Sequence, residues 1–238
     1  MDDWIQVLLL TLMAGMAMPV GALLARVENI HTVWLKVEFR HTVMAFGGGA
    51  LLSAIALVLV PEGASQLSVF PVAVLFLAGG CSFMVLDMFL ARHQSPAGQL
   101  VAMLSDFVPE ALALGAAFAT DGSAGVLLAA LIAIQNLPEG FNSFNELSEK
   151  AGVSAGKIIG AFFLLALLGP VSGLVGFFVL ADYPVLVGGI MIFAAGGILY
   201  LVFEDIAPQA KMEQRWFPAM GAVSGFLLGL VGQMLVQV

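Results

Sequence analysis

The sequence predicts an all-α integral membrane protein of eight transmembrane helices, arranged as an inverted 3+2+3 repeat with helices four and five central. Three observations predict this fold: the composition, the position of the basic residues and an internal repeat. Of the 238 residues, 61% are hydrophobic and only 10% are charged, whereas about a quarter of the residues of soluble domains are charged. The chain is therefore expected to form one transmembrane domain over residues 1–238.

Eight apolar stretches are each long enough to cross the hydrocarbon core of a bilayer, which takes about 20 helical residues. They fall at residues 4–25, 41–61, 69–91, 98–120, 123–146, 157–180, 184–207 and 216–237. The connections between them are short and leave no room for a soluble domain.

The basic residues predict the orientation. All of them fall in or beside the odd-numbered connections: Arg26, Lys36, Arg40, Arg92, Lys150, Lys157, Lys211 and Arg215. The other connections and the N-terminus carry acids instead: Asp2, Asp3, Glu62, Asp121 and Asp182. Because cytoplasmic loops are enriched in lysine and arginine, we expect a multi-pass protein of the plasma membrane (the inner membrane of a bacterium) with both termini outside.

Several classes of protein are disfavoured. Sixteen acids against eight bases argue against nucleic acid as a partner, and the single cysteine, Cys81, excludes a disulfide framework. The acidic start Met1-Asp2-Asp3 is not that of a removable signal. The chain has no Gly-x-Gly-Asp, His-Glu-x-x-His or Gly-x-Ser-x-Gly motif, so we expect neither an enzyme nor a bound cofactor.

An internal repeat relates the two ends of the chain. A shift of 147 residues superimposes Phe46, Gly49, Leu52 and Pro61 on Phe193, Gly196, Leu199 and Pro208, and Pro71 on Pro218. Pro19-Val20 matches Pro170-Val171 at a slightly different offset. The copies, at about 4–91 and 157–237, are five spans apart and must cross the membrane in opposite directions. Secondary transporters often have such inverted repeats, with the substrate near the midplane.

A shorter match relates the central helices, at about 98–146. It superimposes Asp106, Pro109 and Glu110 on Gln135, Pro138 and Glu139. Each acidic or amide pair is four residues apart, so its members share one helix face. An ionised carboxylate at mid-membrane costs roughly 2.5–3.5 kcal/mol, so these groups should face one another, water or a cation.

Each of these prolines lacks an N–H and frees the carbonyl one turn earlier, at Ser105 and Ile134. Carboxylates, amide oxygens and free carbonyls together favour a cation site. Polar residues continue along helix five at Gln135, Glu139, Asn142 and Glu146, a face that we interpret as an exit path toward the cytoplasm. Glu146 is equally compatible with an ordinary helix end, and Asp87, Glu204 and Asp205 are interpreted as solvated carboxylates.

The sequence resembles the Zrt/Irt-like (ZIP) family of divalent metal transporters along nearly its whole length. Gln135-Asn136-Leu137-Pro138-Glu139-Gly140 is similar to the family's His-Asn-x-Pro-Glu-Gly, and Val108-Pro109-Glu110-Ala111 to its partner motif. Val60-Pro61-Glu62-Gly63 and Ile206-Ala207-Pro208-Gln209-Ala210 are also similar to family segments.

The resemblance implies a binuclear metal site, but this sequence differs from the family at several of the ligand positions. The positions of the first site correspond to Asp106, Glu110, Gln135 and Glu139, so both family histidines are replaced. The positions of the second site hold Phe107 and Asn136, and the segment Leu168-Gly169-Pro170 of helix six has no acid. We therefore expect a mononuclear site, formed by Asp106, Glu110, Gln135, Asn136 and Glu139, with less advantage for zinc over harder cations.

The leading hypothesis is a carrier that moves a divalent metal ion into the cytoplasm. The ion is its substrate, left open among Zn, Mn, Fe, Cd and Mg, and its environment is the lipid bilayer. Two alternatives stay open: a transporter fold with a changed substrate, a proton or a small cation, and a membrane scaffold that transports nothing. A homodimer is implied by the resemblance alone.

Overall fold

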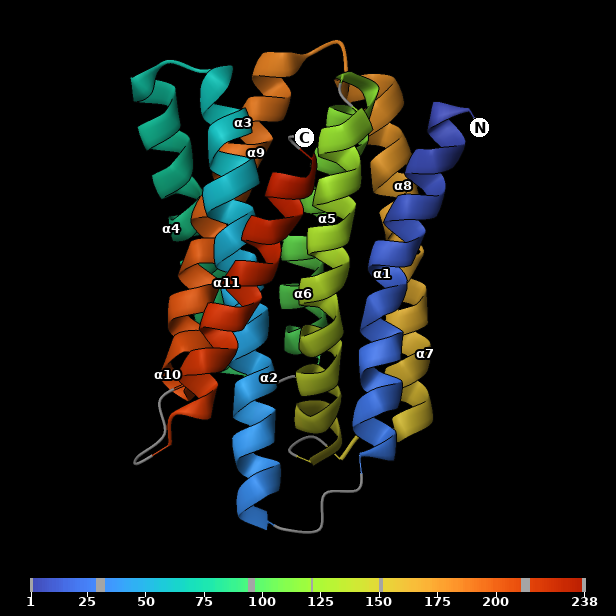
Figure 1. The fold of residues 1–238 in the computed structure, drawn as a ribbon, viewed down its shortest axis with the longest axis vertical. Coiled ribbons are helices and arrows are strands. Elements are labelled where there is room, and N and C mark those ends of the chain that lie inside the picture. The colour runs from blue at the N-terminus through green and yellow to red at the C-terminus, as the bar shows by residue number, and fades with distance from the viewer. Residues whose placement is uncertain are drawn as a thin grey trace.

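The chain is all-helical. A computed structural model describes residues 2–28, 33–93, 97–120, 122–149, 152–210 and 215–236, at some helix positions by the backbone alone. All regular secondary structure in these ranges is helical, and the helices join into eight rods (Figure 1). The predicted all-α membrane fold is confirmed.

The rods correspond one to one to the predicted spans. In chain order they are α1 (Asp3–Val27); α2 (Val33–Ala54) with the π-helix η1 (Ile55–Leu59) and α3 (Val60–Ser65); α4 (Val69–His93); α5 (Ala97–Thr120); α6 (Gly122–Glu149); α7 (Ala155–Ala166) with α8 (Leu168–Val175) and the π-helix η2 (Gly176–Leu180); α9 (Pro184–Leu201) with the π-helix η3 (Val202–Ile206) and α10 (Ala207–Ala210); and α11 (Phe217–Val236).

Six rods within the described ranges are long and apolar enough to cross a membrane by length and composition. The other two are α5 and α6, which carry the polar motif residues; among the described residues of α5, Phe107–Ala119 form a shorter apolar helix. Their 24 and 28 residues correspond to about 36 and 42 Å of helix at 1.5 Å per residue, more than the roughly 30 Å of a hydrocarbon core. The two helices that carry the motifs are therefore long enough to span but too polar to face lipid.

Two features of the rods differ from the prediction. The second rod begins at Val33 rather than near residue 41, so Lys36 and Arg40 lie inside a helix. An apolar stretch marks the part of a helix that crosses the membrane, whereas the polar residues in this first part of α2 end the stretch without ending the helix. The π-helices η1, η2 and η3 were not predicted, because an extra residue in one turn leaves the apolar pattern unchanged.

Glycines allow the closest helix contacts. A Cβ atom on Gly49 of α2 would overlap the carbonyl oxygen of Ala222 on α11, and one on Gly79 of α4 would overlap that of Phe193 on α9. Small residues at such crossings let two backbones approach closely, which is how helices associate in membranes in the absence of a hydrophobic driving force.

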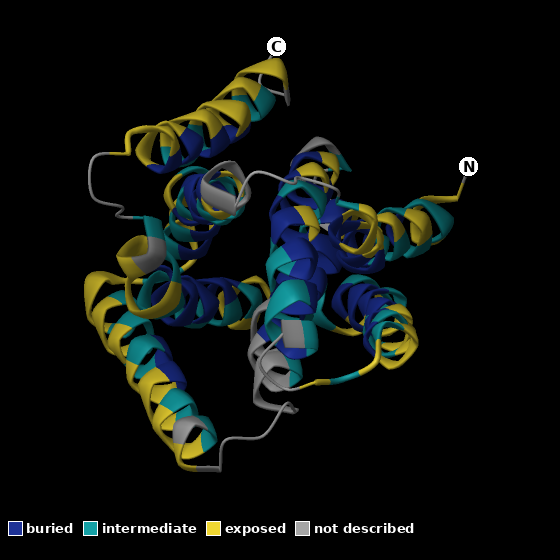
Figure 2. Cartoon of the chain, turned by 90° about the horizontal axis from the view of Figure 1, so that it is seen from below, coloured by how far each residue is buried: buried dark blue, intermediate teal, exposed yellow. Residues whose placement is uncertain are grey.

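The rods form two groups. The first helix group is α1, α5, α6, α7 and α8; the second is α2, α3, α4, α9 and α11, and the two meet where α2 packs on α6 and α5 on α9. Buried residues concentrate where the helices face one another, and exposed residues lie on the outer sides (Figure 2). Few residues of α4 and α11 are buried, and both helices expose many large apolar side chains, as expected for surfaces that face lipid.

The described basic residues lie at one end of the bundle. Arg26 lies in the last turn of α1, Arg92 near the end of α4, Lys157 in the first turn of α7, and Arg215 just before α11. Successive rods are antiparallel (Figure 1), so these positions share the end at which α1 connects to α2. We call it the basic end, and the opposite end the terminal end.

The glycine contacts lead to a stability prediction. Gly49→Ala should destabilise the fold by about 1–3 kcal/mol, the usual cost of overpacking, and lower the midpoint of thermal unfolding in detergent. Gly160→Ala on α7 is the matched control, because no atom lies within 4 Å of the added Cβ; alanine should be neutral there or stabilise by about 0.5–1 kcal/mol. Equal midpoints for the two variants would contradict this packing.

Candidate metal site

The centre of the bundle is occupied by α5 and α6, each with an internal proline. Pro109 lies inside α5 and Pro138 inside α6, and both helices continue through them. A proline lacks the N–H that would bond the carbonyl four residues before it. Within a membrane, a backbone oxygen freed in this way is tolerated where it lines a cavity or is buried in protein.

The motif side chains of α5 and α6 meet at Glu110 and Gln135. Nε2 of Gln135 donates to both carboxylate oxygens of Glu110, at 2.6 Å from each. Glu110 is 0% exposed and Gln135 is 1% exposed. The sequence predicted that the polar groups of these helices face one another, water or a cation, and Glu110 and Gln135 face one another. The side chain of Asp106, one turn before Glu110, lies outside the described part of the structure.

The next amide points elsewhere. Nδ2 of Asn136 donates to the carbonyl oxygen of Ala14 on α1 at 3.0 Å, and Asn136 is fully buried. Consecutive helical residues point about 100° apart, so Gln135 contacts α5 while Asn136 contacts α1. Oδ1 of Asn136 has no hydrogen-bond partner in the described part of the chain, and its place among the ligands stays a prediction.

A polar cavity of about 150 Å³ lies between the two helix groups and extends from Gln135 toward the basic end. All four residues of the predicted polar face on α6 line it: Gln135, Glu139, Asn142 and Glu146. The remaining lining residues come from α2, α6, α9 and η3: Met44, Gly47, Leu51, Pro138, Ser143, Ile198, Leu201, Asp205 and Ile206.

Asp205 is the residue that sequence reasoning missed. It is exposed, as expected of a solvated carboxylate, and it also lines the polar cavity together with Glu139 and Glu146. It lies in the π-helix η3, where a widened turn changes the direction of the side chains that follow. A signal was present in the acidic pair Glu204-Asp205 near the end of an otherwise apolar span, but only the fold shows which cavity it reaches.

A second, larger cavity is chemically different. It has a volume of about 870 Å³ and is lined mainly by apolar residues of α9, with Leu75 of α4 and Pro109 of α5. Its one acidic lining residue is Asp182, at the terminal end. The polar cavity is therefore the candidate site for a cation. Within the described part of the chain, no three histidine, cysteine, aspartate or glutamate side chains are close enough to hold a metal ion.

Comparison with known proteins agrees with the motifs. No family model matches the chain. The zinc transporter ZupT of Chlorobium phaeovibrioides is 25% identical to it over an alignment of 269 residues, which covers 97% of this chain and 96% of ZupT. This similarity, together with the motifs, supports membership of the Zrt/Irt-like (ZIP) family. Asp106 and Gln135 stand where, by the sequence resemblance, the family has the two histidines of its first metal site.

Phe107, which by the sequence resemblance stands at a position of the family's second metal site, packs between two neighbouring helices. Phe107 is 1% exposed, and its ring lies close to Gly15 of α1 and Gly169 of α8. A Cβ atom on either glycine would be within 3.0 Å of the ring carbon Cζ. The helices α1 and α8 thus pack on a phenyl group.

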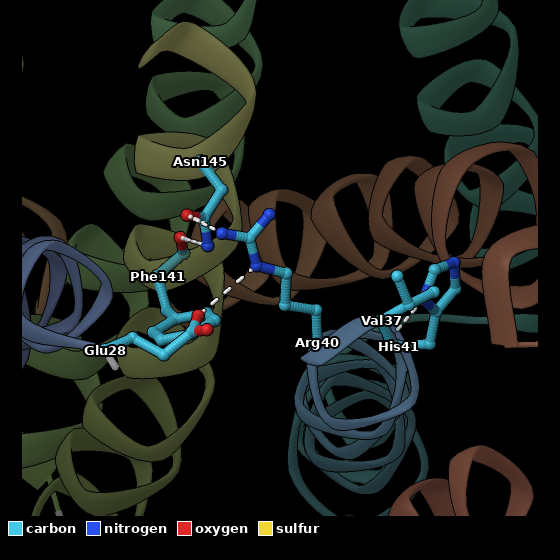
Figure 3. Close-up of polar contacts among 6 residues, drawn as sticks. All are labelled: Glu28, Val37, Arg40, His41, Phe141 and Asn145. Atoms are coloured by element: carbon cyan, nitrogen blue, oxygen red, sulfur yellow. Dashed lines mark hydrogen bonds and ion pairs between the residues drawn. The ribbon is translucent and has the colours of Figure 1, made fainter. Parts of the chain in front are cut away.

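An arginine links the two helix groups near the basic end of the cavity (Figure 3). Arg40 of α2 donates from Nε to the carboxylate of Glu28, just after α1, at 3.3 Å, and from a terminal nitrogen to Oδ1 of Asn145 on α6 at 2.9 Å. Asn145 in turn donates to the carbonyl oxygen of Phe141 at 3.1 Å. His41 points away, toward the carbonyl oxygen of Val37 in its own helix (Figure 3).

This ion pair is largely buried, which leads to a second prediction. The Glu28 side chain is 5% exposed and that of Arg40 is 19% exposed. Arg40→Met should destabilise the fold by about 1–3 kcal/mol, because a buried carboxylate loses its charged partner. The double variant Arg40→Met with Glu28→Gln should recover part of that loss.

The control for this prediction is Arg26→Met, because Arg26 is exposed at the end of α1. It should unfold at the wild-type temperature in the same detergent. A double variant no more stable than Arg40→Met alone would show that the ion pair does not account for the loss.

Proposed function

We propose that the chain carries a divalent metal ion across the membrane through a carboxylate and amide site between α5 and α6. The contact between Glu110 and Gln135 carries this proposal. It places hard oxygen ligands at the buried centre of the bundle, next to a polar cavity that Glu139 also lines. Oxygen ligands of this kind suit divalent cations. The similarity to a zinc transporter supports the same class of substrate.

The ion leaves through the polar cavity in this proposal. Glu139, Asn142 and Glu146 succeed one another on α6 toward the basic end, and Asp205 faces the same space from η3. Carboxylates along such a path offer an ion successive weak sites, which favours passage over tight binding. Asn136 is the fifth proposed ligand: its Nδ2 donates to Ala14 on α1, and its Oδ1 has no hydrogen-bond partner in the described part of the chain.

Transport is directed into the cytoplasm. The basic end carries the described arginine and lysine side chains, and cytoplasmic loops are enriched in these residues. With this orientation, both termini lie outside the plasma membrane and the polar cavity opens toward the cytoplasm. Labelling of single cysteines near the two ends, in a background with Cys81 replaced, would test the orientation.

One ion binds at a time. By the sequence resemblance, Phe107 stands at a position of the family's second site; its buried ring packs near Gly15 of α1 and Gly169 of α8, and a phenyl group offers no ligand to a divalent cation. None of the proposed ligands Asp106, Glu110, Gln135, Asn136 and Glu139 is a histidine. The site should therefore favour zinc less than a site with imidazole ligands does.

The inverted repeat is part of the proposal. The π-helices η1 (Ile55–Leu59) and η3 (Val202–Ile206) lie 147 residues apart, the offset of the sequence match. Glycines of the outer helices repeat the same contacts: a Cβ on Gly79 would overlap the carbonyl oxygen of Phe193, and one on Gly225 that of Phe46. These correspondences support two copies of one unit around α5 and α6.

Uptake by proteoliposomes tests the function. Glu110→Gln together with Glu139→Gln should abolish uptake of Mn²⁺ and Zn²⁺, because the site loses two negative charges while the shapes of the side chains stay the same. Glu62→Gln is the control, since Glu62 is exposed at the terminal end, and its uptake should stay near the wild-type rate. Unchanged uptake by the double variant would refute the site; proton flux without metal uptake by the wild type would favour a changed substrate.

The ligand types also predict the preference among metals. Gln135→His should raise the ratio of Zn²⁺ to Mn²⁺ uptake severalfold, because imidazole nitrogen suits zinc better than the harder manganese ion. Competition between the two ions in the same proteoliposomes measures this ratio directly. A ratio that does not change would mean that Gln135 is not in contact with the transported ion.

A further inference from the structure

The contact between Gln135 and Glu110 has the geometry of a bound cation. Nε2 of Gln135 is equidistant from the two carboxylate oxygens, at 2.6 Å from each. An N–H donor usually lies about 2.9–3.0 Å from a single oxygen. A calcium ion held by both oxygens of one carboxylate lies about 2.3–2.6 Å from them. The amide nitrogen therefore occupies the position that a bidentate cation would take on Glu110.

The charge of Glu110 determines which end of the amide faces it. An ionised carboxylate accepts hydrogen bonds and donates none, so it attracts the NH₂ group and repels Oε1. Consequently, Oε1 of Gln135 has no hydrogen-bond partner in the described part of the chain, although the residue is 1% exposed. A buried acceptor without a partner is costly, and a cation beside it would remove that cost.

We propose that the Gln135 amide is a built-in substitute for the cation. It caps Glu110 while the site is empty, and an arriving divalent ion displaces it. The side-chain amide then turns about its last bond, so that Nε2 leaves Glu110 and Oε1 becomes a ligand of the ion. This inference rests on the proposed function, because it assumes that Glu110 binds the transported ion.

The cap has two physical consequences. It lowers the cost of a buried carboxylate in the empty protein, because a donor satisfies both oxygens. The amide is neutral, so Glu110 keeps its negative charge and still attracts cations. The affinity for an ion is then the difference between two states, in which Glu110 holds either the ion or the amide, and Gln135 sets that difference.

The state of the amide can be observed directly. Full-length protein in nanodiscs would carry ¹⁵N in its glutamine side chains, and Gln135→Met would identify the Gln135 signal. In metal-free protein, the Gln135 amide protons should exchange with water at least roughly tenfold more slowly than those of exposed Gln66, as expected for a buried hydrogen bond to a charged group. Saturating Zn²⁺ should shift the Gln135 signal and leave the Gln66 signal in place.

Affinity provides the second measurement. Gln135→Glu removes the cap and adds a carboxylate, so the Kd for Mn²⁺ should fall by roughly tenfold or more, the change expected when one hydrogen bond to a charged group no longer competes. Gln233→Glu on α11 makes the same chemical change outside the polar cavity, and its Kd should stay near that of the wild type.

The outcomes separate this inference from the proposed function. If wild-type protein binds Zn²⁺ with unchanged Gln135 exchange and chemical shift, the cap is refuted while metal binding stands. If Gln135 amide protons in metal-free protein exchange as fast as those of Gln66, the cap is also refuted. If the wild type binds neither Zn²⁺ nor Mn²⁺, the proposed function fails and the inference fails with it.

Discussion

An ionised carboxylate buried in a membrane must be compensated by a nearby donor or cation, and this constraint governs the centre of the molecule. Glu110 has no exposed surface, and Gln135 satisfies both of its oxygens from the neighbouring helix. That contact requires α5 and α6 to face each other, and other helices must enclose them. Close backbone approaches provide the enclosure: a Cβ on Gly115 of α5 would overlap α8, and one on Gly140 of α6 would overlap α1.

The surroundings of the pair differ between its two sides. Toward the basic end, the face of α6 that lines the cavity is polar through Glu146. Toward the terminal end, α5 and α6 continue with buried apolar residues, among them Leu114 and Phe118 on α5 and Leu128 on α6. Since an ion needs polar ligands or water along its path, the proposed transport would release the ion toward the basic end.

Sequence patterns predicted those features that depend on local chemistry. The eight rods follow from apolar length, and the meeting of Glu110 with Gln135 follows from the cost of burying both. Features that depend on the direction in which a side chain leaves its helix could not be predicted from the sequence. The four-residue spacing could not reveal that Asn136 faces α1, and a hydropathy pattern does not register the π-helix that brings Asp205 to the cavity. The loss of a second metal site stays a prediction from residue types, whereas the packing of Phe107 on Gly15 and Gly169 is known only from the fold.

The central claim is that one divalent cation binds between α5 and α6. Anomalous scattering from crystals soaked separately in Mn²⁺, Zn²⁺ and Cd²⁺ tests it most directly, because it locates an ion and counts it. The account predicts a single peak within coordination distance of Glu110 and Glu139, with Oε1 of Gln135 turned toward it, and no peak beside the Phe107 ring. Two peaks between these helices, or none with any of the three metals, would contradict it.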